Sequence, residues 1–217
     1  MRLESFELRG KHVLLEPLET AHAADLAAAS AGDPSFYSWT YVPQGEKEMS
    51  RYIDAALAAR DAGTAWPFVT RLVQTGKIIG ATRYFDLEWW PWPEGHARRD
   101  RWAPDVCEIG YTWLQRDAIR TAANTEAKLL MMTYAFQVWG VHRVVLHTDE
   151  RNARSRAAIE RIGGKFEGIL RAHRLASDFT PRNSARYSII AAEWPEVRAR
   201  MEKRLEQGGA PERPTAA

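Results

Sequence analysis

Apolar residues recur at two different periods along the chain, and these periods predict alternating strands and helices. Alternation predicts a first strand near residues 12–18, and an alanine-rich helix is expected over residues 19–29. A second helix is predicted over residues 46–62, where Gly63 ends it. Two antiparallel strands then lie on either side of a Thr-Gly turn at Gly76.

The second half of the chain twice places a helix directly after a strand. The first strand begins near Cys107, and the second covers residues 144–148 and leads into a helix near Asn152. Consecutive units of this kind imply one shared sheet. A final strand is predicted over residues 187–192 and a closing helix over residues 194–205. The pattern therefore favours an α/β protein.

The segment EIGYTWLQRDAIRTAANTE, residues 108–126, predicts a strand that runs through a short loop into a helix. Cys107, Ile109 and Tyr111 alternate with polar residues, so we expect them on one face of the strand. Residues 124–126, Asn-Thr-Glu, are typical of a helix start. Such a start offers unpaired N–H groups to an anion, with arginines in the approaching loop. A plain turn with solvated arginines is the alternative.

Composition narrows the class of protein. With 217 residues, 45% hydrophobic content and a net charge of +2, the chain is expected to form one domain over residues 8–206, followed by a disordered tail over residues 207–217. The small net charge gives no case for nucleic-acid binding. No run of 18 apolar residues predicts a membrane span, and a single cysteine suits a reducing compartment, so we expect a cytoplasmic protein.

Three motifs carry a resemblance to a known family. The chain reads IGYTWL, then IRTAANTEA, and then NARSRAAIERIGGKFEG. Together they resemble the GNAT superfamily of N-acetyltransferases, and within it the RimJ/RimL-like branch, over about residues 10–195. The resemblance implies a GNAT fold, α/β or α+β, with a mixed, mostly antiparallel central sheet of six to seven strands flanked by helices. It also implies direct transfer of acetyl from acetyl-CoA to a primary amine, either a protein N-terminus or a small amine.

The resemblance also assigns residues to acetyl-CoA. Trp113 and Leu114 would pair their backbone with pantetheine, while Asn152 and Ser155 would flank its amides and sulfur. The pyrophosphate would lie against one run of residues: Arg120, Thr121, Ala122, Ala123, Asn124 and Thr125. Ala122 and Asn124 stand where the superfamily often has glycine. Ile159 stands where many relatives carry a tyrosine acid, which members of this branch commonly lack.

Catalysis at an amine needs a base, because a primary amine is mostly protonated at neutral pH. The resemblance puts Glu108 beside the acetyl group as that base; alternatively Glu108 pairs with an arginine at the strand edge. The resemblance also places Ser155 beside the departing sulfur. Its alternative role is helix capping, but Asn152 is the simpler cap and leaves Ser155 free. His147 at a strand end and His173 in a loop after a turn at Gly168 are expected to be packed or solvated.

No residue spacing typical of a metal site occurs, and the single cysteine, Cys107, is expected to be an inert core residue. The tryptophan segment, residues 88–102, has the sequence EWWPWPEGHARRDRW and is predicted to be irregular. Its Trp90 and Trp92 form either a wall of the acceptor pocket or an apolar plug for the loop. An earlier loop rich in aromatics, residues 33–43, is called the aromatic loop. Its Trp39 and Tyr41 either contact the acceptor or pack in the core.

Two other classes of function stay open on the sequence. The chain could keep the fold as a non-catalytic acyl-CoA-binding protein, since the loop glycines and the tyrosine are missing. It could also be an interaction module that docks through the tryptophan segment. For the acetyltransferase, the sequence also leaves a homodimer open.

Overall fold

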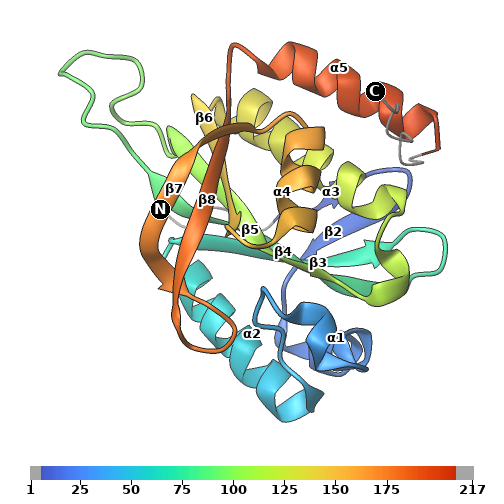
Figure 1. The fold of residues 1–217 in the computed structure, drawn as a ribbon. Coiled ribbons are helices and arrows are strands. Elements are labelled where there is room, and N and C mark those ends of the chain that lie inside the picture. Colours follow the sequence, from blue (N-terminus) through green and yellow to red (C-terminus); the bar gives the residue numbers. More distant parts are fainter. Residues whose placement is uncertain (1–5, 209–217) are drawn as a thin grey trace.

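A computed structural model describes residues 6–208 and arranges its strands in one eight-stranded sheet (Figure 1). The strand order is β1-β2-β3-β4-β5-β6-β8-β7. The strands are β1 (Leu8–Arg9), β2 (Val13–Pro17), β3 (Ala65–Leu72), β4 (Ile78–Glu88), β5 (Val106–Leu114), β6 (Arg143–Asp149), β7 (Lys165–Leu175) and β8 (Pro181–Ile190). Among the strands of residues 6–208, only β5 and β6 pair in parallel. The mixed, mostly antiparallel sheet is confirmed, with more strands than the six to seven predicted.

Helices cover both faces of the sheet (Figure 1). The helices are α1 (Ala23–Ser30), α2 (Gly45–Asp61), α3 (Ala122–Thr133), α4 (Ala153–Arg161) and α5 (Trp194–Glu206). Met131 of α3 and Met201 of α5 belong to one buried cluster, and Leu26 of α1 and Ile53 of α2 belong to another. The sheet therefore separates two cores, which we call the α3 face and the α2 face.

The prediction missed two strands and misplaced the start of a third. β1 is only two residues long, and most residues of β7 are exposed, so neither shows the alternation of a half-buried strand. His173 lies within β7 and not in a loop, because the chain continues as a strand through Gly168. The final strand starts at Pro181, six residues before the predicted Tyr187.

Helix α3 begins earlier than predicted. Thr121 caps it by accepting a hydrogen bond from the Ala123 amide at 3.2 Å, so residues 124–126 lie inside the first two turns. Glu126 has another role. Its buried carboxylate accepts hydrogen bonds from the consecutive amides of residues 11–13 at 2.9, 2.6 and 2.7 Å. The turn between β1 and β2 is thereby attached to the start of α3.

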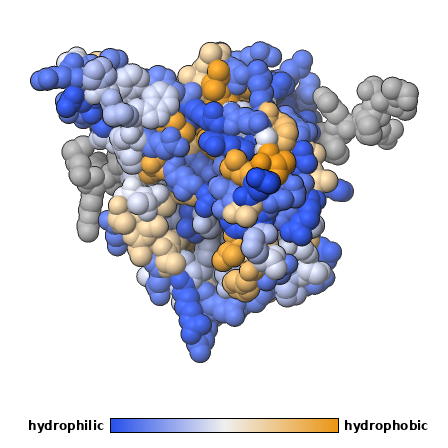
Figure 2. Space-filling model, turned by 60° about the vertical axis from the view of Figure 1, so that its left-hand side comes forward, coloured by the Kyte–Doolittle hydropathy of each residue, from blue (hydrophilic) through white to orange (hydrophobic). Residues whose placement is uncertain are grey.

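The outer surface carries its apolar side chains in small groups separated by hydrophilic residues on the face shown in Figure 2. Among residues 6–208, no helix has the length and apolar character needed to cross a membrane. Most of the predicted disordered tail, residues 209–217, lies outside the described residues, so that prediction stays untested.

Candidate active site

The two parallel strands separate in the middle of the sheet. Their pairing ends at Glu108 and Val145, although β5 continues to Leu114 against β4 and β6 continues to Asp149 against β8. The second half of β5 therefore presents a free backbone edge toward β6. Such an edge offers N–H and C=O groups to an extended ligand, although the Leu114 carbonyl also accepts a hydrogen bond from the Tyr37 hydroxyl at 3.3 Å. Trp113 and Leu114, the residues predicted to pair with pantetheine, lie on this half of β5.

A bulge reverses the faces of β5 at Tyr111. The pairing with β4 shifts between Ala81 and Arg83, and Tyr111 has a positive φ of 50°. Before the bulge, Ile109 packs in the α3-face core; after it, Trp113 packs in the α2-face core. Tyr111 itself is 46% exposed. The strand that the alternation of Cys107, Ile109 and Tyr111 predicts is present, but the bulge ends that alternation at Tyr111.

The loop before α3 has features suited to an anion. Arg120 adopts the left-handed conformation with φ of 63°, while Ala122 begins the helix without such strain. Within the described residues, the side-chain oxygen Oδ1 of Asn124 is buried and has no hydrogen-bond partner. Arg116 and Arg120 are both exposed near this helix start. The loop thus combines the positive end of a helix with exposed cationic side chains.

The start of α4 lies across a groove from the aromatic loop. Asn152 caps α4 by accepting a hydrogen bond from the Ser155 amide at 3.0 Å, which confirms the predicted cap. The Ser155 hydroxyl makes no hydrogen bond to any residue between 6 and 208. Phe36 stands across the groove with the guanidinium groups of Arg116 and Arg154 5.5 and 5.1 Å from its ring. Asn152 therefore lines the groove, and the half-buried Ser155 follows it in the first turn of α4.

Glu108 lies at the point where β5 and β6 separate and is only 4% exposed. His147 of β6 places Nδ1 2.8 Å from the Glu108 carboxylate, although the angles are not those of a hydrogen bond. Arg174 of β7 lies 3.6 Å from the same oxygen. The ring of His173 is 4.8 Å from that of His147, and burial together with this neighbour lowers the pKa of His173. Glu108 is thus a buried carboxylate among three basic side chains.

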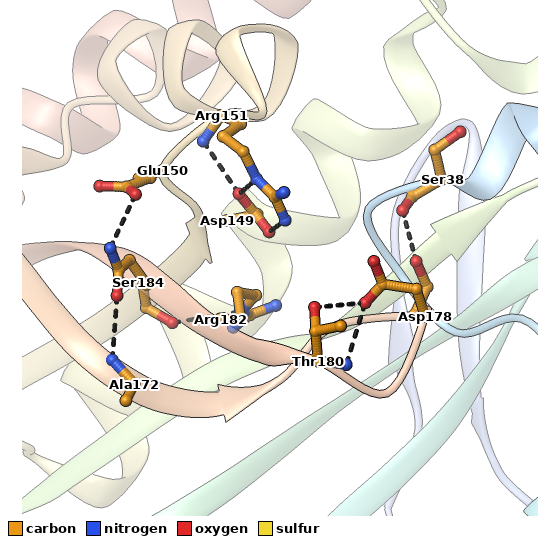
Figure 3. A network of polar contacts seen from close by, with 11 residues as sticks. Ser38, Asp149, Glu150, Arg151, Ala172, Asp178, Thr180, Arg182 and Ser184 are labelled. Carbon is orange, nitrogen blue, oxygen red and sulfur yellow. Dashed lines mark hydrogen bonds and ion pairs between the residues drawn. The ribbon is translucent and has the colours of Figure 1, made fainter.

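The turn between β7 and β8 contacts the aromatic loop, residues 33–43, at Ser38 (Figure 3). Ser177 donates a hydrogen bond to the carbonyl of Ser38. Asp149 at the end of β6 holds Arg151 by two hydrogen bonds at 2.9 and 2.7 Å, and Arg151 lies over Trp39 at 4.8 Å. The hydrogen bonds from Arg151 lower the pKa of Asp149. Tyr41 packs loosely against Phe179, with ring centroids 6.5 Å apart.

The tryptophan segment packs elsewhere, at the start of β5. Trp90 stacks on His142 with ring centroids 4.9 Å apart, and Trp92 donates from Nε1 to Asp105 at 3.0 Å. Arg98 donates to the carbonyl of Gly140 at 3.0 Å. These contacts fasten the projecting loop to the turn before β6 (Figure 1). The structure does not bring Trp90 and Trp92 together with Glu108, which favours the plug over the acceptor wall.

Three residues near Glu108 were not predicted from the sequence as part of the site. Arg174 was missed because β7 was not predicted, and Arg83 on β4 gave no motif. Lys128 of α3 is buried and donates to Thr112 Oγ1 at 2.7 Å; burial lowers its pKa to about 7. An isolated lysine in a long helical pattern would be expected at the surface. Its burial depends on the packing of α3 on the sheet, which sequence spacing alone does not specify.

The comparisons with known proteins agree with this geometry. The family model described as "Acetyltransferase (GNAT) domain" matches residues 12–165, most of the chain. A crystal structure of a GCN5-related N-acetyltransferase from Brucella melitensis has a TM-score of 0.79 at 27% identity, covering 94% of this chain and 87% of that one. No curated protein sequence matches the chain. The chain belongs to the GNAT acetyltransferase family, whose members use acetyl-CoA.

Two further solved structures are similar in fold alone. RimJ of Mycobacterium smegmatis, in complex with CoA-disulfide, has a TM-score of 0.72 at 20% identity, covering 92% of this chain and 93% of that one. A ribosomal-protein-S5-alanine acetyltransferase from Vibrio fischeri has a TM-score of 0.66 at 14% identity, covering 87% and 98%. Both share the architecture described above.

Proposed function

We propose that the protein transfers acetyl from acetyl-CoA directly to a primary amine, in the manner of the RimJ/RimL-like branch. The observation that carries the proposal is the opening between β5 and β6, with Glu108 at its inner end and the start of α3 at its mouth. The domain that does this would span residues 8–206. Its single cysteine, Cys107, is buried, and burial raises the pKa of its thiol, which suits a core residue in a reducing cytoplasm.

The residues present fit acetyl-CoA. The buried Oδ1 of Asn124 and the N-terminal amides of α3 lie in the loop that would hold the pyrophosphate. Arg120 supplies charge there, and the cradle would include the other residues of the loop: Thr121, Ala122, Ala123 and Thr125. Trp113 and Leu114 would pair their free backbone edge with the pantetheine amides. Acetyl-CoA supplies the thioester carbonyl that the amine attacks.

Glu108 would remove the proton that blocks the amine. An ammonium ion gives one proton to the Glu108 carboxylate, and the neutral nitrogen then attacks the thioester carbon. As the carbon–sulfur bond breaks, the thiolate takes a proton that the new amide nitrogen loses. The products are an N-acetylated acceptor, free CoA thiol and one proton, released to solvent when Glu108 ionises again.

His147 and Ser155 would assist at either end of the reaction. His147, with Nδ1 2.8 Å from the Glu108 carboxylate, would position that group and carry its proton outward. The hydroxyl of Ser155 would donate a hydrogen bond to the departing sulfur and stabilise its negative charge until the proton arrives. Trp39 and Tyr41 would border the acceptor side, because their loop contacts the turn between β7 and β8. Trp90 and Trp92 would serve as the plug.

Isothermal titration with acetyl-CoA tests the cofactor site first. Wild type should bind, and Arg120→Ala and Asn124→Asp should each weaken binding at least about tenfold, which is the effect of losing one charge-assisted contact or adding a like charge. Arg51→Ala, on the exposed side of α2, is the matched control and should bind as wild type does. No binding by wild type would refute the proposal.

Thiol release with a panel of amines tests the chemistry separately. Glu108→Gln should lower kcat at least about a hundredfold while acetyl-CoA affinity stays within about twofold. Binding without turnover by wild type on any amine would instead identify a non-catalytic acyl-CoA-binding protein.

A further inference from the structure

Arg83 of β4 is a buried guanidinium without a counter-ion. Its side chain points to the α2 face, and the residue is only 8% exposed. Its contacts are with two aromatic rings: its Cζ lies 4.0 Å from the ring centroid of Tyr111 and 5.3 Å from that of Tyr52. Within residues 6–208 it takes part in no hydrogen bond or ion pair. Its nitrogens keep access to solvent, since none is among the fully buried atoms that lack a partner.

An unpaired guanidinium at this depth is unfavourable. Charged groups are rarely found so deeply buried unless they are paired, because desolvation is costly. Stacking on two rings offsets part of that cost but leaves the N–H edge of the guanidinium unused. The side chain is therefore held between the rings of Tyr52 and Tyr111, and its N–H donors have no partner among residues 6–208.

The neighbouring carboxylates are already engaged with other bases. Glu108 contacts His147 at 2.8 Å and Arg174 at 3.6 Å. Asp86, further along β4, forms an ion pair with Arg174. Both carboxylates are therefore engaged, which leaves the guanidinium of Arg83 available to an anionic group of a bound molecule.

Arg83 lies close to the catalytic carboxylate of the proposed reaction. It pairs with Gly110 across the β4–β5 ladder, and the next facing pair is Phe85 with Glu108. Arg83 and Glu108 are thus diagonal neighbours on one face, a separation of about 7–8 Å between backbone positions. Gly110 between them has no side chain, and a Cβ there would lie 2.8 Å from the Phe85 ring. The ring of Phe85 therefore packs directly over Gly110, and no side chain of residue 110 stands between the two charged groups.

We propose that the acceptor amine carries a carboxylate that pairs with Arg83. This inference rests on the proposed function and specifies its substrate class. The amine of the acceptor would lie at Glu108 and its carboxylate at the two-donor edge of the Arg83 guanidinium. The two groups would be a few bonds apart in the same acceptor. The same chemistry is present in a free amino acid and in a peptide N-terminus whose second residue is acidic.

Matched acceptors test the carboxylate requirement by thiol release with acetyl-CoA. Free amino acids are compared with their amides, and tripeptides with Asp at the second position are compared with the same peptides bearing Asn. For wild type, KM should be at least about tenfold lower for the carboxylate member of the pair in one of the two arms, as expected for charge-assisted hydrogen bonds. The arm that shows the difference identifies the source of the carboxylate.

The Arg83 variants test the assignment to this residue. In Arg83→Gln the preference should disappear through a higher KM for the carboxylate acceptor, with an unchanged KM for the neutral one. Arg83→Lys should keep part of the preference, because it retains the charge and loses the fork. Arg51→Gln, next to Tyr52 in sequence but on the exposed side of α2, is the matched control and should retain the full preference.

The possible results separate this inference from the proposed function. Turnover without any preference in wild type, or a preference that persists in Arg83→Gln, overturns the inference and leaves the acetyltransferase. Absence of acetyl-CoA binding overturns both. If Arg83→Gln does not fold, titration of wild type with the products decides: N-acetyl amino acids or N-acetyl Asp peptides must bind at least about tenfold more tightly than their neutral partners, and equal or absent binding overturns the inference.

Discussion

Replacing Lys128 with Met should remove a pH dependence of stability that this buried lysine creates. Burial lowers the pKa of Lys128 in the folded protein to about 7, against an ordinary value near 10.4 in the unfolded chain. Between these two values the unfolded state binds more protons than the folded state does, so the free energy of unfolding rises with pH. The contribution is complete above the unfolded pKa and is lost as the pH falls through about 7.

The size of the effect follows from the two pKa values. Each pH unit over which only the unfolded state keeps the proton contributes about 1.4 kcal/mol. Integrated from pH 6 to pH 8.5, a folded pKa near 7 gives about 2 kcal/mol. Burial raises the pKa of Cys107 and of Tyr84, which acts in the opposite sense at higher pH, so the comparison stays below pH 8.5.

Urea denaturation of wild type and Lys128→Met at pH 6, 7 and 8.5 measures this contribution. The stability of wild type relative to the variant should increase by about 2 kcal/mol over that range, because the effects of all other groups cancel in the difference. The variant fits the site, since Thr82 and Thr112 still share a hydrogen bond at 2.8 Å. Lys47→Met on the exposed side of α2 controls for the chemical change. A difference that stays constant within about 0.5 kcal/mol would show that Lys128 remains charged, and would refute the reasoning.

Three further changes have defined outcomes. Thr121→Ala removes the side-chain cap of α3 and should lower the free energy of unfolding by about 1 kcal/mol in urea denaturation, whereas Thr121→Ser should not. Glu126→Gln removes the negative charge and replaces one acceptor oxygen by an NH2 group, so at least one of the three amides loses its acceptor. It should cost about 2–4 kcal/mol by the same assay, and a change below about 0.5 kcal/mol would contradict that role. Trp90→Ala removes the stacking on His142 and should lower the free energy of unfolding by about 1 kcal/mol without altering the acceptor KM. A raised KM would instead show that Trp90 contacts the acceptor.

Most of the architecture could be predicted because its strands and helices bury one face. The residues before Asn152 alternate and those after it have helical spacing, and the structure follows that pattern through β6 and α4. β7 could not be found in this way, since it lies at the edge of the sheet and most of its residues are exposed. The loss of β7 from the prediction also concealed His173 and Arg174 as neighbours of Glu108.

The site was predictable where a motif marks it and not where a backbone angle shapes it. Thr121 and Asn152 lie in recognisable motifs, and both cap helices next to the opening between β5 and β6. The left-handed φ at Tyr111 follows from strand pairing with β4 and has no sequence signal of its own, yet it exposes that ring to Arg83. Such a contact depends on three elements meeting, and no spacing along one chain encodes it.

The Glu126 carboxylate occupies an anion-binding site that the protein's own backbone forms. Three successive amides of residues 11–13 donate to it, as they would to a bound anion. Removing the segment that carries those amides would leave a buried negative charge beside the start of α3. A shortened or fused protein therefore has to keep the chain from Lys11 onward if the start of α3 is to stay intact, although Lys11 lies about a hundred residues before it.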